Sequence, residues 1–248
     1  MCTLSFIPKP GGYLLGMNRD ERLSRPPALP PQYIAEAALP CLYPQEPEGG
    51  TWIGANAAGT AFVILNWNIS VDRSLQRVSR GTLIPRLLDS RDAVSTGRQL
   101  EQFDLAGILP FRLVGIFPGA QEVREWRWNM QALSSHGHGW LANHWFSSGA
   151  SDDLAEFHRG LAARAAWQAA NAGAIEWLRA LHRSHAPARG PFSLCAHRED
   201  AGSVSYTEIA CLNGSLEMSY HPGSPCERSP AQTLSLRLQA AQEQTAHV

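Results

Sequence analysis

The amino-acid sequence predicts an α+β fold in which antiparallel sheets are covered by helices. Three observations lead to this prediction: strand-like segments occur in groups separated by helix-like segments, neighbouring strands are joined by short turns, and no βαβ pattern is present. The chain has 248 residues, of which 44% are hydrophobic, and this suits one soluble domain. We expect that domain over residues 1–227, and a peripheral helix or loose tail over 228–248, where the sequence is polar and rich in Ala and Gln.

Two hairpins are expected in the first third of the chain, with strands at 3–7, 13–18, 51–55 and 60–66. Their turns contain Pro and Gly at 8–12, and Asn and Gly at 56–59. Between the hairpins, the prolines of 24–47 cannot donate to a strand ladder, so this stretch is expected to be an extended surface loop. Helical patterning follows at about 82–89 and 92–103.

The second half of the chain repeats this alternation of strands and helices. Short strands are expected at 112–117, 122–128 and 140–142, separated by a Pro-Gly turn and by the Gly-rich stretch 136–139. Ser151 followed by two aspartates is a good helix start, so a helical pair is expected at 151–172 and 175–185. The last strands are expected at 192–197, 204–210 and 215–220.

The composition excludes several classes of function. Charged residues make up 17% of the chain and the net charge is −1, so nucleic acid or an anionic membrane has little to bind. No apolar run approaches the roughly 20 residues of a membrane span. The first ten residues lack the features of a signal peptide, and we therefore expect a cytoplasmic protein. The five cysteines include no CxxC pair and are expected to be free thiols, and no nucleotide or other cofactor is indicated.

Cys2 is the first candidate for chemistry. Removal of Met1 would leave a thiol and a free α-amine on one residue, and an amine with a pKa of about 7.7–8.0 can accept the thiol proton without a histidine. The first hairpin brings the sequence NRDE at 18–21 back beside Cys2, and strand alternation places Asn18 and Asp20 on one face. Asp20 could orient the amine there. A surface charge cluster at a strand end is the alternative interpretation.

These residues resemble a known family. The start MCT, NRDE at 18–21, GGTWIG at 49–54 and SRG at 79–81 are together similar to the NRDE family, also called the transport and Golgi organisation protein 2 family. The same landmarks are similar, more distantly, to the choloylglycine hydrolases and penicillin V acylases of the N-terminal nucleophile (Ntn) superfamily. The resemblance implies a four-layer αββα sandwich and the hydrolysis of linear amide bonds.

The resemblance also implies a role for individual residues. Cys2 matches the nucleophile, and Asp20 matches the aspartate that holds the amine and the thiol in place. Asn66, in the sequence ILNW, is similar to the asparagine that helps to form the oxyanion hole. Asn143, in the sequence WLANH, looks like a later asparagine that contacts the amine or the substrate.

The chain also departs from the acylases. They carry an arginine three residues before the aspartate, where this chain has Met17, and Arg19 instead directly precedes Asp20. Their second, late arginine has no clear counterpart, although Arg80 could project into a pocket from a helix start. We therefore expect Asn18, Arg19 and Arg80 to bind the substrate.

Two functional hypotheses follow. The first is an N-terminal cysteine hydrolase that cleaves a small linear amide or related acyl bond through an S-acyl intermediate on Cys2. The second is a non-catalytic carrier of haem or lipid, since members of the NRDE family have been linked to haem handling and lipid metabolism. Cys195 and His197 would share a strand face, which permits a thiol–imidazole pair or two metal ligands. Because no second pair is near in sequence and a structural zinc site needs four ligands, we expect no metal.

Overall fold

The computed structural model describes residues 2–239, in which two antiparallel sheets are stacked face to face. The first sheet contains, in spatial order, β10 (Asn143–Ser147), β1 (Cys2–Lys9), β2 (Gly12–Arg22), β11 (Ala201–Leu212), β12 (Ser215–Pro222) and β13 (Gln232–Arg237). The second sheet runs in chain order through β3 (Leu29–Ile34), β4 (Cys41–Gln45), β5 (Ile53–Asn56), β6 (Ala61–Asn66), β7 (Phe111–Phe117), β8 (Glu122–Trp128) and β9 (Leu133–His138).

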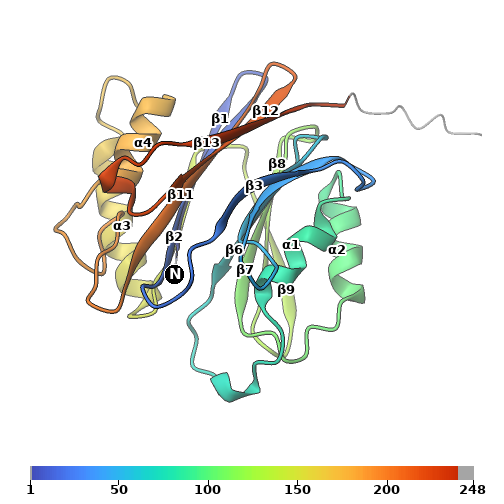
Figure 1. Ribbon diagram of the computed structural model, residues 1–248, viewed down its shortest axis with the longest axis horizontal. Helices are drawn as coiled ribbons and strands as arrows, with labels where there is room; N and C mark the ends of the chain where they lie inside the picture. The colour runs from blue at the N-terminus through green and yellow to red at the C-terminus, as the bar shows by residue number, and fades with distance from the viewer. Residues whose placement is uncertain (1, 240–248) are drawn as a thin grey trace, which may run out of the picture.

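Helices cover the outer face of each sheet (Figure 1). The second sheet carries α1 (Leu83–Leu87) and α2 (Ala93–Gln102), and the first carries α3 (Asp152–Ala166) and α4 (Ile175–Arg183). Short 3-10 turns are η1 (Arg73–Leu75), η2 (Arg80–Thr82) and η3 (Pro225–Glu227). The predicted four-layer αββα architecture is therefore confirmed.

The helix starts follow from the local sequence. Asp92 caps α2 by accepting a hydrogen bond from the Ser95 amide, and Ser151 caps α3 by accepting one from the Leu154 amide. No helix within residues 2–239 is long and apolar enough to cross a membrane.

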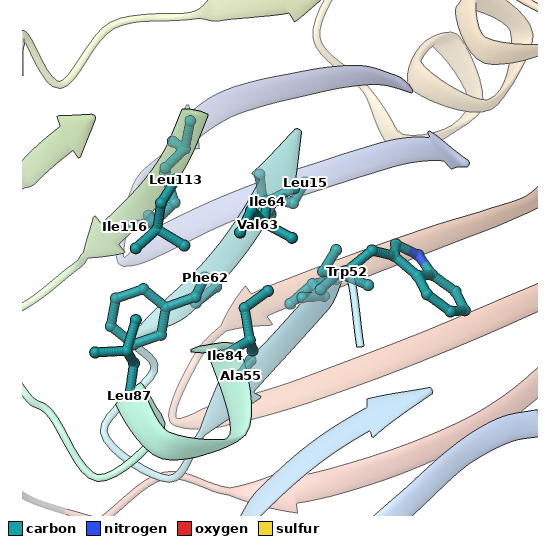
Figure 2. Packing of buried hydrophobic residues seen from close by; sticks show 14 of the residues in the cluster. Leu15, Trp52, Ala55, Phe62, Val63, Ile64, Ile84, Leu87, Leu113 and Ile116 are labelled. Carbon is teal, nitrogen blue, oxygen red and sulfur yellow. The ribbon is translucent and has the colours of Figure 1, made fainter. Parts of the chain in front are cut away.

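Both faces of the β1–β2 hairpin are buried. Leu4 and Phe6 of β1 belong to the large apolar cluster between the sheets, whereas Ile7 belongs to the cluster beneath α3 and α4. Figure 2 shows Leu15 of β2, Val63 of β6 and residues of α1 within the large cluster. A hairpin buried on both faces has a strongly specified register, since a slip of one residue would exchange its two faces. The register of β1 against β2 therefore fixes what lies beside Cys2.

The predicted loop at 24–47 is wrong, because β3 and β4 lie within it. The edge position of β3 explains how a strand tolerates so many prolines. Pro30 and Pro31 fall where the register against β4 shifts, between Leu29 and Gln32, and missing amide donors do little harm there.

Other element predictions also need correction. Residues 192–197 are turns and bends rather than a strand, with one isolated bridge from His197 to Gly202. The Gly-rich stretch at 136–138 lies inside β9, and the next strand begins at Asn143 rather than at 140. The first helix of the pair ends at Ala166 rather than at 172.

The predicted helix or tail after 228 is also wrong over residues 232–237, which form β13. This strand pairs with β12 along its whole length, and Leu234 and Leu236 pack on the core between the sheets. The sheet therefore extends past residue 227. Residues 240–248 of the predicted tail lie outside the described residues.

Candidate active site

Cys2 is the first residue of β1 and lies between two neighbouring strands. It is the register partner of Arg19 in β2 and of Ser147 in β10, and its side chain is buried in the cluster between the sheets. A cavity of about 90 Å³ reaches the thiol. Its lining includes Cys2, Arg19, Asp20, Trp52, Asn66 and Arg80.

Asp20 lies next to the nitrogen of Cys2. Because Cys2 is opposite Arg19 in an antiparallel pair, Asp20 lies one position further along β2, on the side of the Cys2 nitrogen. The Asp20 carboxylate is buried, and it accepts a hydrogen bond of 2.6 Å from the Ser203 hydroxyl of β11. A free α-amine on Cys2 would therefore meet a carboxylate that is already held in position.

Arg159 of α3, which is not among the site residues predicted from the sequence, joins Asp20 to Cys2. Its guanidinium is fully buried, lies 3.2 Å from the Asp20 carboxylate, and donates to the Thr3 hydroxyl at 2.9 Å and, more weakly, to the Cys2 carbonyl at 3.4 Å. Arg159 is 139 residues from Asp20 along the chain. A signal was present: Arg159 shares one helix face with the buried Ala155 and Ala163, where an arginine is unusual unless paired.

The thiol of Cys2 is held in its neutral form by its surroundings. Burial raises the pKa of Cys2, while the Asp20 backbone N–H and the Arg19 guanidinium act in the opposite direction without cancelling it. A neutral thiol is a weak nucleophile, so chemistry on Cys2 needs a proton acceptor close by.

Arg19 and Arg80 form cationic walls of the cavity. Arg19 lies over the Trp52 ring, 4.5 Å from its centroid, and its guanidinium is 2.7 Å from the Glu46 carboxylate. Arg80 donates to the Pro110 carbonyl. Burial and the nearby Arg73 lower the pKa of Arg80 to about 10, so it remains a cation at neutral pH.

Asn66 ends β6 at the same cavity and also borders a wider opening of about 710 Å³. The fold therefore brings Cys2, Asp20 and Asn66 together, although Asn66 comes from the other sheet. Charged side chains dominate the wider opening; they are Asp20, Glu21, Arg22, Arg25, Arg73, Arg80, Arg198 and Asp200.

Asn143 is not brought to the site. It pairs with Phe6, four residues along β1 from Cys2, which corresponds to a separation of about 13 Å along the strand. Its side-chain oxygen accepts a hydrogen bond from the His144 amide. The implied contact of Asn143 with the amine or the substrate therefore has no support in the geometry.

Asn18 also faces away from the cavity. Its amide group donates to the carbonyls of His182 and Leu194, and its oxygen pairs with Nδ1 of His182 at 3.0 Å. These bonds use the side chain to join β2 to α4 and to the segment before β11. Asn18 is thus placed as a structural residue on the helix side of the sheet rather than at the substrate.

Three buried polar atoms near Cys2 have no hydrogen-bond partner among the described residues. They are the hydroxyl of Ser147, the register partner of Cys2 in β10, Nε of Arg159, and the indole nitrogen of Trp52, whose residue lines the cavity. Leaving a buried donor unpaired is unfavourable, so the Trp52 indole nitrogen, whose residue lines the cavity, is available to a bound molecule.

Comparison with known protein families identifies the family to which this chain belongs. Residues 1–174, more than half of the chain, match the family described as Transport and Golgi organisation 2. The chain belongs to this family. No curated protein matches the sequence significantly.

Solved structures with a similar fold are Ntn-type acylases. Penicillin V acylase from Agrobacterium tumefaciens has a TM-score of 0.53 at 12% identity, over 96% of this chain and 86% of the acylase. Two variants of conjugated bile acid hydrolase from Clostridium perfringens have TM-scores of 0.57 and 0.50 at 10% and 9% identity, over 96% of this chain and 92% of theirs. At such identities the likeness shows the fold alone. This member of the Transport and Golgi organisation 2 family thus has a hydrolase-like scaffold.

Proposed function

We propose that this protein is an N-terminal cysteine hydrolase that cleaves a small linear amide or related acyl bond through an S-acyl intermediate on Cys2. The observation that carries the proposal is the register of β1 against β2, which places the buried Asp20 beside the nitrogen of Cys2. Removal of Met1 would turn that nitrogen into the only base that the neutral thiol needs.

The reaction follows from these positions. The α-amine accepts the thiol proton, and the sulfur attacks the substrate carbonyl to give a tetrahedral intermediate. The intermediate collapses as the leaving amine takes the proton from the ammonium, which leaves a thioester on Cys2. Water then attacks the thioester, the α-amine accepts a proton from the water and returns it to the sulfur, and the carboxylic acid is released.

Charge in this cycle is balanced by groups on the cavity wall. The Asp20 carboxylate stabilises the ammonium form of the amine, while Arg159 and Ser203 fix the orientation of that carboxylate. Asn66 lines the cavity, and in this mechanism its side-chain N–H donates to the developing oxyanion. One such donor is worth about 3–4 kcal/mol of barrier.

The charges at the opening favour a substrate that carries a carboxylate or another anionic group. Arg73 and Arg80 border the opening and form no ion pair within the described part of the chain. Such cations attract an anion and orient it through charge-assisted hydrogen bonds.

Carriage of haem or lipid remains the alternative prediction, with Cys2 as a binding rather than a catalytic residue. The geometry argues against it at this site, because the cavity of about 90 Å³ at Cys2 is too small for a large ring system or an acyl chain, and the opening of about 710 Å³ beside it is lined mainly by polar and charged side chains.

Extension of the chain tests the proposal. Extra residues ahead of Cys2 convert the amine into an amide that cannot act as a base, so turnover on a panel of N-acyl amides should be abolished. Proteolytic removal of the extension to expose Cys2 should restore it. The matched control carries the same residues after Val248 and should hydrolyse the panel normally. Unchanged turnover by a fully extended, uncleaved protein would refute the mechanism.

Acyl trapping tests the same site independently of turnover. Mass spectrometry of protein quenched during reaction should find the acyl group on the peptide that begins with Cys2. A haem or lipid carrier would bind its ligand with either extension and would show no acylated peptide.

A further inference from the structure

Two histidines and two cysteines converge at one place outside the cavity at Cys2. His185 follows α4, Cys195 and His197 lie in the irregular segment before β11, and Cys226 lies in η3. One nitrogen or sulfur atom from each of the four residues lies within 4.8 Å of all the others. None of these residues takes part in the proposed hydrolysis.

Three of the six distances within the cluster, those to Nε2 of His197, are close to the edges of a coordination tetrahedron, and all six are within 4.8 Å. The Nε2 atoms of His185 and His197 are 3.1 Å apart, and the sulfur atoms of Cys195 and Cys226 are 3.5 Å and 3.6 Å from Nε2 of His197. Zinc bonds of about 2.0–2.1 Å to nitrogen and about 2.3 Å to sulfur give tetrahedral edges of about 3.3 Å between nitrogens and about 3.6 Å between nitrogen and sulfur.

Hydrogen bonding alone does not account for this convergence. Nε2 of an imidazole offers either one N–H or one lone pair, so it can form one good hydrogen bond. In this cluster three different groups surround that single atom of His197. A cation at the centre would bind all four atoms at once.

The backbone holds these side chains in place without help from the cluster itself. The Cys195 amide donates to the Ser184 carbonyl at 2.9 Å, and the His197 amide donates to the Gly190 carbonyl at 3.0 Å. His197 also forms a bridge with Gly202 at the start of β11. The Gly223 amide, just before η3, donates to the Val204 carbonyl of β11 at 2.9 Å, so the three segments that carry the ligands are fixed relative to one another.

We propose that the protein binds one zinc ion in a structural site, through His185, Cys195, His197 and Cys226. Two thiolates and two imidazoles in a tetrahedral arrangement are typical of zinc, and four protein ligands leave no open position for catalysis. Binding releases the two thiol protons to solvent, so the two thiolates balance the charge of the ion. Nδ1 of His197 then carries a proton, and its 3.4 Å contact with Arg189 is given up.

Zinc bound at this cluster would stabilise the segment that holds the Ser203 hydroxyl against Asp20. Residues 184–197 form no helix or strand, yet the Ala196 amide donates to the Ser203 hydroxyl, which in turn donates to Asp20. No second pair of ligands lies near Cys195 and His197 in the sequence, which predicts that no metal binds there. The fold supplies that pair as two single residues, His185 and Cys226, from either side of Cys195 and His197 in the chain.

Metal analysis of the purified full chain tests the proposal. The protein is isolated under reducing conditions, without a metal-affinity step, and analysed by inductively coupled plasma mass spectrometry. We expect one zinc ion per chain, loss of the zinc in the double variant Cys195→Ser/Cys226→Ser, and full retention in Cys41→Ser, which removes a buried thiol outside the cluster. Retention of zinc by the double variant would overturn the assignment.

A second measurement on the unmodified chain covers the case in which the double variant fails to fold. Chelation should lower the melting temperature, and stoichiometric zinc should restore it. Cobalt added to the chelated protein should give the visible absorption of a tetrahedral thiolate site. The proposal is overturned if the unmodified chain holds no zinc and added zinc leaves its melting temperature unchanged, if another transition metal occupies these ligands, or if Cys195 and Cys226 are found as a disulfide.

Discussion

Acidification should destabilise the fold through two buried histidines that the native state keeps neutral. Burial lowers the pKa of His144 to about 4 and that of His182 to about 3. A histidine in the unfolded chain titrates near pH 6.5. Below that pH the unfolded chain binds protons that the folded protein does not. The stability that comes from keeping these two histidines neutral is therefore fully present at higher pH and is lost as the pH falls.

Hydrogen bonding explains why both rings stay neutral. The Trp167 indole can only donate, so it fixes Nε2 of His144 as an acceptor, and Nδ1–H of His144 donates to the Ser5 hydroxyl. That hydroxyl then donates to Nε2 of His182, whose Nδ1–H donates to Asn18. An added proton on either Nε2 would face a donor across this buried chain.

The magnitude follows from the titration. At about pH 5 the pH is about 1.5 units below the pKa of each histidine in the unfolded chain and still above its pKa in the folded protein. Each histidine therefore lowers the free energy of unfolding by about 2 kcal/mol, and the pair by about 4 kcal/mol. Urea unfolding at pH 7.5 and at pH 5 measures the loss. His182→Gln should reduce it by about half, whereas the control His136→Gln, at an exposed position of β9, should leave it unchanged. A loss in the unmodified chain of less than about 1 kcal/mol would refute this reasoning.

Three further predictions concern the cavity around Cys2. Asn66→Ala should lower kcat on any substrate found by about 10²–10³ with little change in substrate binding, as for an oxyanion donor, whereas Asn143→Ala should leave kcat within a few-fold. Arg159→Met should lower the free energy of unfolding in urea by about 3–5 kcal/mol, because it removes the buried cation that lies 3.2 Å from the Asp20 carboxylate; a loss below about 1 kcal/mol would contradict this. Gly50→Ala should be more destabilising than Gly49→Ala in the same assay, since both have positive φ but only at Gly50 would a Cβ meet backbone, at 2.9 Å from Gly81; equal losses would contradict it.

The sequence by itself determined those features of the site that depend on a local hairpin. Alternation along β1 and β2, with a short turn between them, is enough to place Asp20 beside the nitrogen of Cys2. The family resemblance added Asn66, whose approach to Cys2 depends on the stacking of two sheets. It also suggested Asn143, which the register of β10 places four residues away from Cys2.

Features that depend on packing between distant segments were decided only by the tertiary structure. The pairing of Arg159 with Asp20 requires α3 to lie on the outer face of the first sheet, and no sequence spacing encodes that contact. The same holds for β3, because its two adjacent prolines are tolerated at the edge of the sheet and at a shift in register, neither of which the sequence shows.

The cluster of His185, Cys195, His197 and Cys226 shows the same division most clearly. Sequence spacing reveals Cys195 and His197 as one pair of potential ligands, but it shows no second pair nearby. The other two ligands are far away in the chain: His185 lies 10 positions before Cys195, and Cys226 lies 29 positions after His197. Periodicity and turn chemistry act over a few residues and can be read from a sequence. Convergence of side chains from separate segments depends on how the helix and sheet layers pack against one another. That packing is determined by the burial of apolar surface along the whole chain.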